Sequence, residues 1–90
     1  MDRRGGDEKI VAAALRAWRD YVISAPPPAR HSDLIRQWSE TQPRRFPSGG
    51  EQGFLTSEGH FVDRATAADI AFRARQTNHR KAQLFTEDLW

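Results

Sequence analysis

The stretch from residue 50 to residue 64, GEQGFLTSEGHFVDR, restricts the fold more than any other part of the chain. Two short runs with apolar and aromatic side chains, QGFLT and HFV, flank the turn-forming sequence Ser-Glu-Gly at 57–59. This order predicts a tight β-hairpin over residues 52–62. Asp63 follows at once, and an aspartate before an alanine-rich run is typical of a helix N-cap. The stretch therefore predicts a hairpin that leads directly into a helix.

The alanine-rich run RATAADIAFRARQ predicts this helix over about 64–76. One face of it carries mostly small apolar side chains, namely Ala67, Ile70, Ala71 and Ala74. A helix with small residues on its buried face can approach a sheet closely. We therefore expect it to lie flat on the hairpin.

Residues 10–24, IVAAALRAWRDYVIS, allow two interpretations. The alanines favour a helix, and apolar residues recur at helical spacing at Val11, Leu15, Trp18 and Val22. The alternative is a hairpin in which IVAAAL and YVIS are strands and RAWRD is the turn. That turn has no glycine or asparagine, which counts against the hairpin. The residues alone leave both interpretations open.

The three prolines at 26–28 end this segment, because proline lacks an N–H group and biases the preceding residue towards extended backbone. ARHSDLIRQWSE then predicts a helix over about 31–41, with Ser32 as a plausible cap. Its inward-facing residues are Leu34, Ile35 and Trp38. A proline- and glycine-rich loop follows and carries Arg44 and Arg45.

The last seven residues, LFTEDLW at 84–90, are too apolar to stay in solvent, so we expect them to dock on the core or on a neighbouring subunit. Residues 1–9 are polar and are expected to be flexible. Residues 10–90 are expected to form a single α+β domain.

A 90-residue chain buries only about 60% of the surface that its unfolded form exposes, so its own core is marginal and a partner subunit would help. Its nine aromatic residues raise the expectation of an interface, and with it of a homo-oligomer. Twelve of the 14 basic residues are arginine, whose planar fork of donors suits phosphates and carboxylates. A GC-rich genome would explain the arginine bias equally well.

The chain has no cysteine, which excludes disulfides, thiolate metal sites and cysteine nucleophiles and fits a reducing cytoplasm. The longest apolar run, IVAAAL at 10–15, is too short to cross a membrane, and no signal peptide precedes it. We therefore expect a soluble intracellular protein without membrane contact.

Evidence for catalysis in the sequence is weak. RHSD at 30–33 places a histidine and an aspartate near a helix start, but the chain has no H-E-x-x-H spacing, paired-carboxylate motif or serine elbow. Anion recognition is better supported, because arginines lie at loop edges and helix faces. Phe54 and Phe61 could stack on a base, although the core is the alternative place for both. A net charge of +2 disfavours duplex DNA as a partner.

Five stretches together resemble a family of small proteins encoded in phages and prophages: VAAALR, PPPARHSDLI, GEQGFLTSEGHFVDR, AADIA and LFTEDLW. The resemblance covers nearly all of residues 10–90 and implies that the first segment is a hairpin. The chain departs from the family pattern at four positions, namely Ser32, His60, Arg75 and Thr86. These departures put in doubt any role that depends on His60 or Arg75.

This family resembles phage anti-Thoeris proteins. The resemblance implies an oligomer that binds and holds a cyclic ADP-ribose isomer or a cyclic oligonucleotide in the cytoplasm of the infected bacterium. Such a protein does not cleave its ligand and needs no cofactor. The residues expected to bind the ligand are Arg30, His31, Asp33, Phe54, Thr56, Phe61, Asp63 and Arg64.

Each expected residue has a chemical role in this hypothesis. Arg30 and Arg64 contact phosphate, and Phe54 or Phe61 stacks on the base. Thr56 and Asp63 bind polar groups of the ligand or cap the helix.

Two further functions stay open. One is a protein–protein inhibitor of a bacterial defence enzyme, comparable to an anti-CRISPR factor. The other is a metal-assisted hydrolase.

Overall fold

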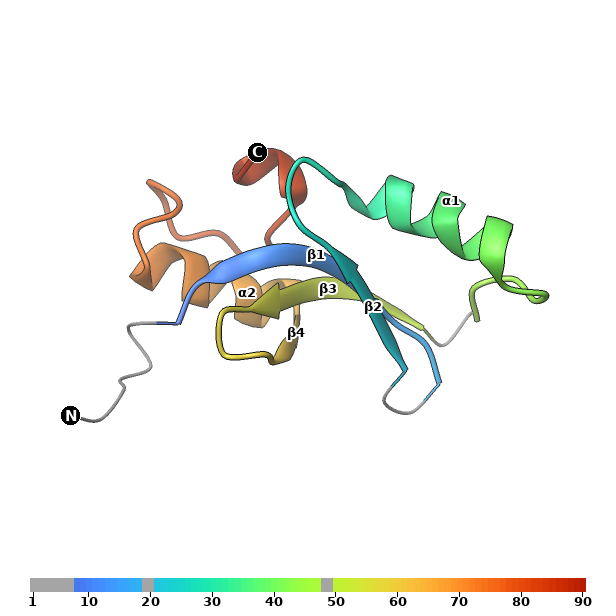
Figure 1. Ribbon diagram of the computed structural model, residues 1–90. Coiled ribbons are helices and arrows are strands. Elements are labelled where there is room, and N and C mark those ends of the chain that lie inside the picture. The colour runs from blue at the N-terminus through green and yellow to red at the C-terminus, as the bar shows by residue number, and fades with distance from the viewer. Residues whose placement is uncertain (1–7, 19–20, 48–49) are drawn as a thin grey trace.

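The computed structural model describes residues 8–18, 21–47 and 50–90 (Figure 1). Most of the N-terminal segment expected to be flexible, residues 1–7, lies outside the described residues. Its last two residues are held by the second hairpin. Glu8 accepts a hydrogen bond from the hydroxyl of Thr56, and the backbone of Lys9 exchanges hydrogen bonds with Ser57.

The fold is α+β, as predicted, and consists of one four-stranded antiparallel sheet with two α-helices (Figure 1). The sheet has the strand order β2-β1-β3-β4. The elements along the chain are β1 Ile10–Arg16, β2 Val22–Ala25, α1 His31–Thr41, β3 Glu51–Thr56, β4 Phe61–Asp63, α2 Arg64–Arg73 and the 3-10 turn η2 Thr86–Asp88.

The first segment is a hairpin, as the family resemblance implied, and the helix that its periodicity favours is wrong. Strand β1 lies in the middle of the sheet and pairs with β2 on one side and β3 on the other. Its residues from Ala12 to Leu15 are all buried, with exposed fractions of at most 5%. A central strand covered on both faces has a continuous apolar run. Pairing with two neighbours outweighs the helix propensity of alanine.

The predicted hairpin at 52–62 is present as β3 and β4, and Gly59 at its turn has φ 83°. A residue with a side chain adopts such an angle at a cost, so glycine suits this turn. Gly53 serves a different purpose, because a Cβ atom there would lie 2.6 Å from the ring of Phe61. Phe61 therefore packs directly on the backbone of β3.

Helix α2 begins where it was predicted, because the carboxylate of Asp63 accepts a hydrogen bond of 2.8 Å from the N–H of Thr66. It ends at Arg73 rather than at the expected residue 76. Two hydrogen bonds close its end, from the N–H of Arg75 to the carbonyl of Phe72 and from that of Gln76 to the carbonyl of Ala71. These bonds form a Schellman motif.

Helix α1 has the predicted bounds of 31–41, but the expected cap at Ser32 is wrong. The N-cap residue is Arg30, whose N–H donates to the carboxylate of Asp33 at 2.8 Å. The carboxylate of Asp33, three residues after the N-cap position, thus provides the capping hydrogen bond that was expected from the hydroxyl of Ser32.

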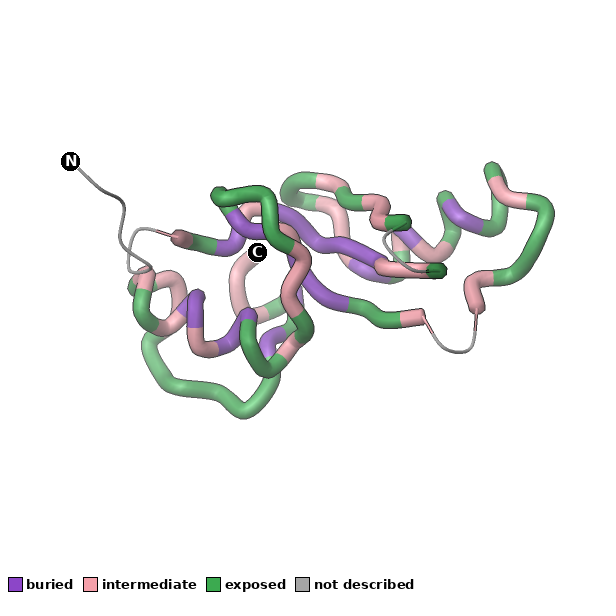
Figure 2. Tube along the Cα trace, turned by 90° about the horizontal axis from the view of Figure 1, so that it is seen from below, coloured by how far each residue is buried: buried purple, intermediate pink, exposed green. Residues whose placement is uncertain are grey.

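Both helices pack on the same face of the sheet. Ala13 and Phe54 are directly paired between β1 and β3 and share this face. Ala13 packs in a cluster with Leu34 of α1, and Phe54 in a second cluster with the alanines of α2. The buried residues run along the central strands and the inner sides of the helices (Figure 2). Helix α2 thus packs on the hairpin by its small residues, as predicted.

The C-terminal run, residues 84–90, docks on this core. Of the two places expected for it, the core and a neighbouring subunit, the first is confirmed. Leu84 is fully buried, and Trp90 packs against both hydrophobic clusters. The indole N–H of Trp90 donates to the carbonyl of Ala29 at 2.9 Å. Trp90 therefore connects the α1 half of the core to the α2 half.

We expect Trp90→Ala to lower the free energy of unfolding by about 2–3 kcal/mol, because it removes a large ring shared by both clusters. Urea denaturation measures this loss. Trp18→Ala is the matched control, since Trp18 is 46% exposed and its removal should cost about 1 kcal/mol. Equal losses in the two variants would contradict a connecting role for Trp90.

Candidate anion-binding site

The structure brings together three of the predicted site residues, Arg30, His31 and Arg64. They border a cavity of about 160 Å³ between the start of α1, the start of α2 and the C-terminal segment. Its other lining residues are Ser32, Phe85, Thr86 and Glu87. We call the group of Arg30, His31, Arg64 and Phe85 the two-arginine corner.

His31 is the buried member of the corner. Its Nε2 lies 2.6 Å from the carbonyl oxygen of Gly53, and because a carbonyl only accepts, Nε2 carries the proton. Its Nδ1 faces Nη2 of Arg64 at 3.5 Å and accepts from it. The ring also stands edge-on to Phe54, with centroids 5.0 Å apart. Burial, together with the charge of Arg64, holds the pKa of His31 below its ordinary value, although the bond to Gly53 opposes this shift.

Arg64 is held by neutral partners. Its Nη1 donates to the carbonyl of Leu84 at 2.8 Å, and its Nη2 donates to the side chain of Gln52 at 2.7 Å. Its guanidinium lies over the ring of Phe85, 4.5 Å from the centroid. Burial lowers the pKa of Arg64, yet an arginine stays charged in a protein. Among the described residues no carboxylate lies within 4 Å of it, and the charge of Glu87, on the same cavity, acts on it only from farther away.

A second cavity of about 250 Å³ adjoins Arg64 from the side of β3 and α2. It is lined by Glu51, Gln52, Asp63, Arg64, Ala65 and Gln83. Arg64 thus separates two small cavities, and its guanidinium can serve a ligand in either.

Arg30 attaches the C-terminal segment to the start of α1. Its guanidinium donates to the hydroxyl of Thr86 at 3.2 Å and to a main-chain oxygen of Trp90. Glu87 lies 3.9 Å away and is 74% exposed, so this ion pair is weak. Arg30 therefore places its guanidinium at the cavity while it holds the C-terminal segment.

The two predicted aspartates are helix caps. Asp33 accepts from the N–H of Arg30, and this bond holds the pKa of Asp33 below its usual range. Asp63 accepts from Thr66, with the same effect on its pKa. Asp33 does not line the cavity at the corner, and Asp63 lines only the second one.

Three predicted residues lie away from the corner. Phe54 is fully buried between the sheet and α2, so it belongs to the core and its predicted stacking on a ligand is wrong. Thr56 is 2% exposed, and its hydroxyl bonds to Glu8 and to backbone N–H groups of the β3–β4 turn. Phe61 packs on Gly53 under the guanidinium of Arg16, on the opposite face of the sheet.

Two residues at this site were not predicted from the sequence. Phe85 is 46% exposed at the corner, and Gln52 orients Arg64. The apolar C-terminal run that contains Phe85 was expected to dock on the core or on a neighbouring subunit. That expectation did not say which part of the surface the run would cover.

The family is established by comparison with known proteins. The chain belongs to the phage T4 y16D protein family, whose model matches residues 9–90. No curated protein and no solved structure gives a significant match.

None of the helices in 8–18, 21–47 and 50–90 has the length and apolar character needed to cross a membrane. In the same ranges, histidine, aspartate and glutamate side chains form no group of three that could hold a metal ion.

We expect the stability of the protein to fall as the pH drops from 7.5 to 5.5. The unfolded chain takes up a proton at His31 near pH 6.5, whereas the folded chain does so only at lower pH, so acid favours unfolding. The loss stops growing below the folded pKa, where both states are protonated. Urea denaturation across this pH range measures it.

His31→Gln should flatten this pH dependence, because glutamine does not titrate. His79→Gln, at an exposed histidine, is the control and should keep the wild-type slope. An unchanged slope in the His31 variant would show that another group is responsible.

Proposed function

We propose that this phage protein binds and sequesters a cyclic nucleotide signal of bacterial immunity, either a cyclic ADP-ribose isomer or a cyclic oligonucleotide. It holds the ligand intact in the cytoplasm of the infected host and uses no cofactor. One observation carries the proposal: Arg64 is a partly buried cation whose hydrogen-bond partners among the described residues are neutral, and Glu87 acts on its charge without forming an ion pair with it. A phosphate in the adjoining cavity would supply a counter-ion in direct contact.

The surroundings of Arg64 favour a phosphate over a neutral ligand. Arg30 adds a second positive charge on the same cavity. Helix α1 begins there with His31 and Ser32, and the start of a helix attracts negative charge through its free N–H groups. The corner thus combines two guanidinium groups with the positive end of a helix.

The size of the cavity points to a ligand shared between copies of the chain. A pocket for a whole nucleotide measures roughly 300–1,000 Å³, whereas the cavity at the corner holds about 160 Å³. It suits one phosphate group, while the exposed ring of Phe85 offers a face on which a base can stack. In this proposal a second copy covers the rest of the ligand, so the protein acts as a homo-oligomer.

The state of His31 supports binding without cleavage. A general base needs a free ring nitrogen that faces the ligand. Both nitrogens of His31 are engaged, one by Gly53 and the other by Arg64. His31 therefore serves in this proposal to position Arg64.

The test is to incubate the protein with cyclic ADP-ribose isomers and cyclic oligonucleotides, wash it, denature it and analyse the released ligand. The wild type should release at least one of these nucleotides intact. Arg64→Ala should lower its affinity at least about tenfold, because it removes charge-assisted hydrogen bonds. Arg45→Ala removes an exposed arginine of a distant loop and should leave the affinity unchanged.

Arg64→Ala could lose binding simply because it unfolds, and Arg64→Lys tests this alternative. Lysine keeps the positive charge but lacks the planar fork of donors. The Arg64→Lys variant should bind more weakly than the wild type and remain folded by circular dichroism. Retention of none of these nucleotides by the wild type would overturn the proposal, and release of a cleaved product would identify an enzyme instead.

A second candidate function, inhibition of a bacterial defence enzyme by direct contact, rests on two exposed aromatic residues. Trp18 and Tyr21, beside the turn between β1 and β2, are 46% and 44% exposed. Their rings lean on the buried ring of Trp38, and the side chain of Gln42 donates to the Tyr21 hydroxyl at 3.2 Å. Tryptophan and tyrosine held in place at a surface are typical of protein interfaces.

This candidate predicts that the protein inhibits at least one member of a panel of purified CRISPR effector nucleases. The double variant Trp18→Ala, Tyr21→Ala should then weaken inhibition by at least about tenfold, as loss of two interface anchors would. Arg64→Ala should inhibit as well as the wild type does. Inhibition that survives the double variant would place the interface elsewhere.

A further inference from the structure

Arg75 holds an unusual backbone conformation at the end of α2. Its φ is 63°, and it is the one residue other than glycine with a positive φ in the described part of the chain. It occupies the position of the Schellman motif where glycine is the usual residue, because a Cβ atom strains a left-handed backbone. Such strain is a reason to ask what the side chain does.

The strained turn is fixed in place. The side-chain amide of Gln76, the next residue, donates to the carbonyl of Ile10 and accepts from the N–H of Ile10, both at 2.9 Å. These two bonds tie the turn to the first strand of the sheet. The backbone of Arg75 is thus held on a rigid support, which is what a binding residue requires.

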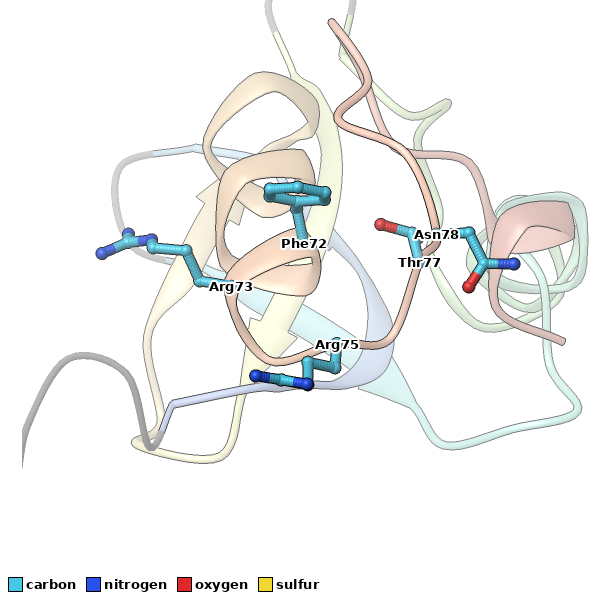
Figure 3. A pocket seen from close by; sticks show the side chains of 5 residues that line it. All are labelled: Phe72, Arg73, Arg75, Thr77 and Asn78. Carbon is cyan, nitrogen blue, oxygen red and sulfur yellow. The ribbon is translucent and has the colours of Figure 1, made fainter.

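The side chain of Arg75 borders a cavity of about 470 Å³ with four others, namely Phe72, Arg73, Thr77 and Asn78 (Figure 3). We call this group the Arg75 pocket. In Figure 3 the guanidinium of Arg75 extends beneath the end of α2, and the loop that carries Thr77 runs past Phe72 on the other side. A helix end and a loop thus border an open, shallow cavity.

The charge around the Arg75 pocket is unbalanced. Asp69 is shared by two arginines, Arg73 at 2.7 Å and Arg80 at 2.6 Å. Arg80 also lies over the ring of Phe72, 4.9 Å from its centroid. Within the described residues Arg75 has no carboxylate within 4 Å, so three arginines stand against two carboxylates, Asp69 and the more distant Glu8 that acts on Arg73. The pocket therefore attracts a negatively charged ligand.

We infer that the Arg75 pocket binds the phosphate or diphosphate group of a small molecule, with the guanidinium of Arg75 as its main donor. This site is separate from the two-arginine corner, with which it shares no lining residue, and it does not depend on the proposed function.

The test is a titration of the ¹⁵N-labelled full chain with inorganic pyrophosphate, followed by NMR. Saturable shifts are expected for the backbone amides of residues 75–78. Arg75→Gly should raise the melting temperature, because it relieves the strained φ, and should weaken pyrophosphate binding at these amides at least about tenfold. A variant that is more stable but binds pyrophosphate more weakly shows that Arg75 acts in binding, because a loss of structure would lower both the melting temperature and the affinity.

Two controls make the result specific. Arg45→Ala removes the same charge from an exposed loop and should change neither quantity. Arg64→Ala should leave the shifts at residues 75–78 intact, which keeps this test independent of the two-arginine corner.

Two outcomes would overturn the inference. One is pyrophosphate binding at residues 75–78 that Arg75→Gly leaves unchanged, or no binding there at all. The other is binding of a single-stranded oligonucleotide at these amides without binding of pyrophosphate.

Discussion

The structure depends on the contact of one indole ring with two separate hydrophobic clusters. The sheet carries one cluster under α1 and another under α2, and Trp90 packs against both. Each cluster has few large side chains, and much of the second consists of alanine. A chain of this size buries little surface, so contacts that join the two clusters matter for its stability. Trp90 joins them, together with His31, whose ring stands edge-on to Phe54.

The same C-terminal segment builds the candidate site. Arg30 donates to a main-chain oxygen of Trp90, Arg64 donates to the carbonyl of Leu84, and the segment presents the ring of Phe85 beneath the guanidinium of Arg64. The carbonyl of Leu84 orients the guanidinium of Arg64 without neutralising its charge, whereas a carboxylate would do both. Docking of the C-terminal segment therefore holds both arginines in place at the cavity.

Local chemistry accounts for what the sequence predicted well. Turn residues and an aspartate cap determine the second hairpin and the start of α2, and these signals act within a few residues. The first hairpin was ambiguous because Ala12–Ala14 suit a helix as well as a strand between two neighbours. The prediction that Phe54 or Phe61 stacks on a base did not foresee that Phe54 is fully buried, because burial depends on which distant segment covers a residue. No short-range pattern carries that information.

The short outer strands of the sheet affect how copies of the protein can meet. At one edge β2 has four residues and runs into Pro26, and at the other β4 has three and runs into α2. A proline lacks the N–H group that strand addition needs, and an edge of three or four residues offers few bonds to a fifth strand. Growth into a continuous β-ribbon or fibril is thus discouraged at both ends. Association is left to side chains on the faces of the molecule, where it can stop at a closed ring.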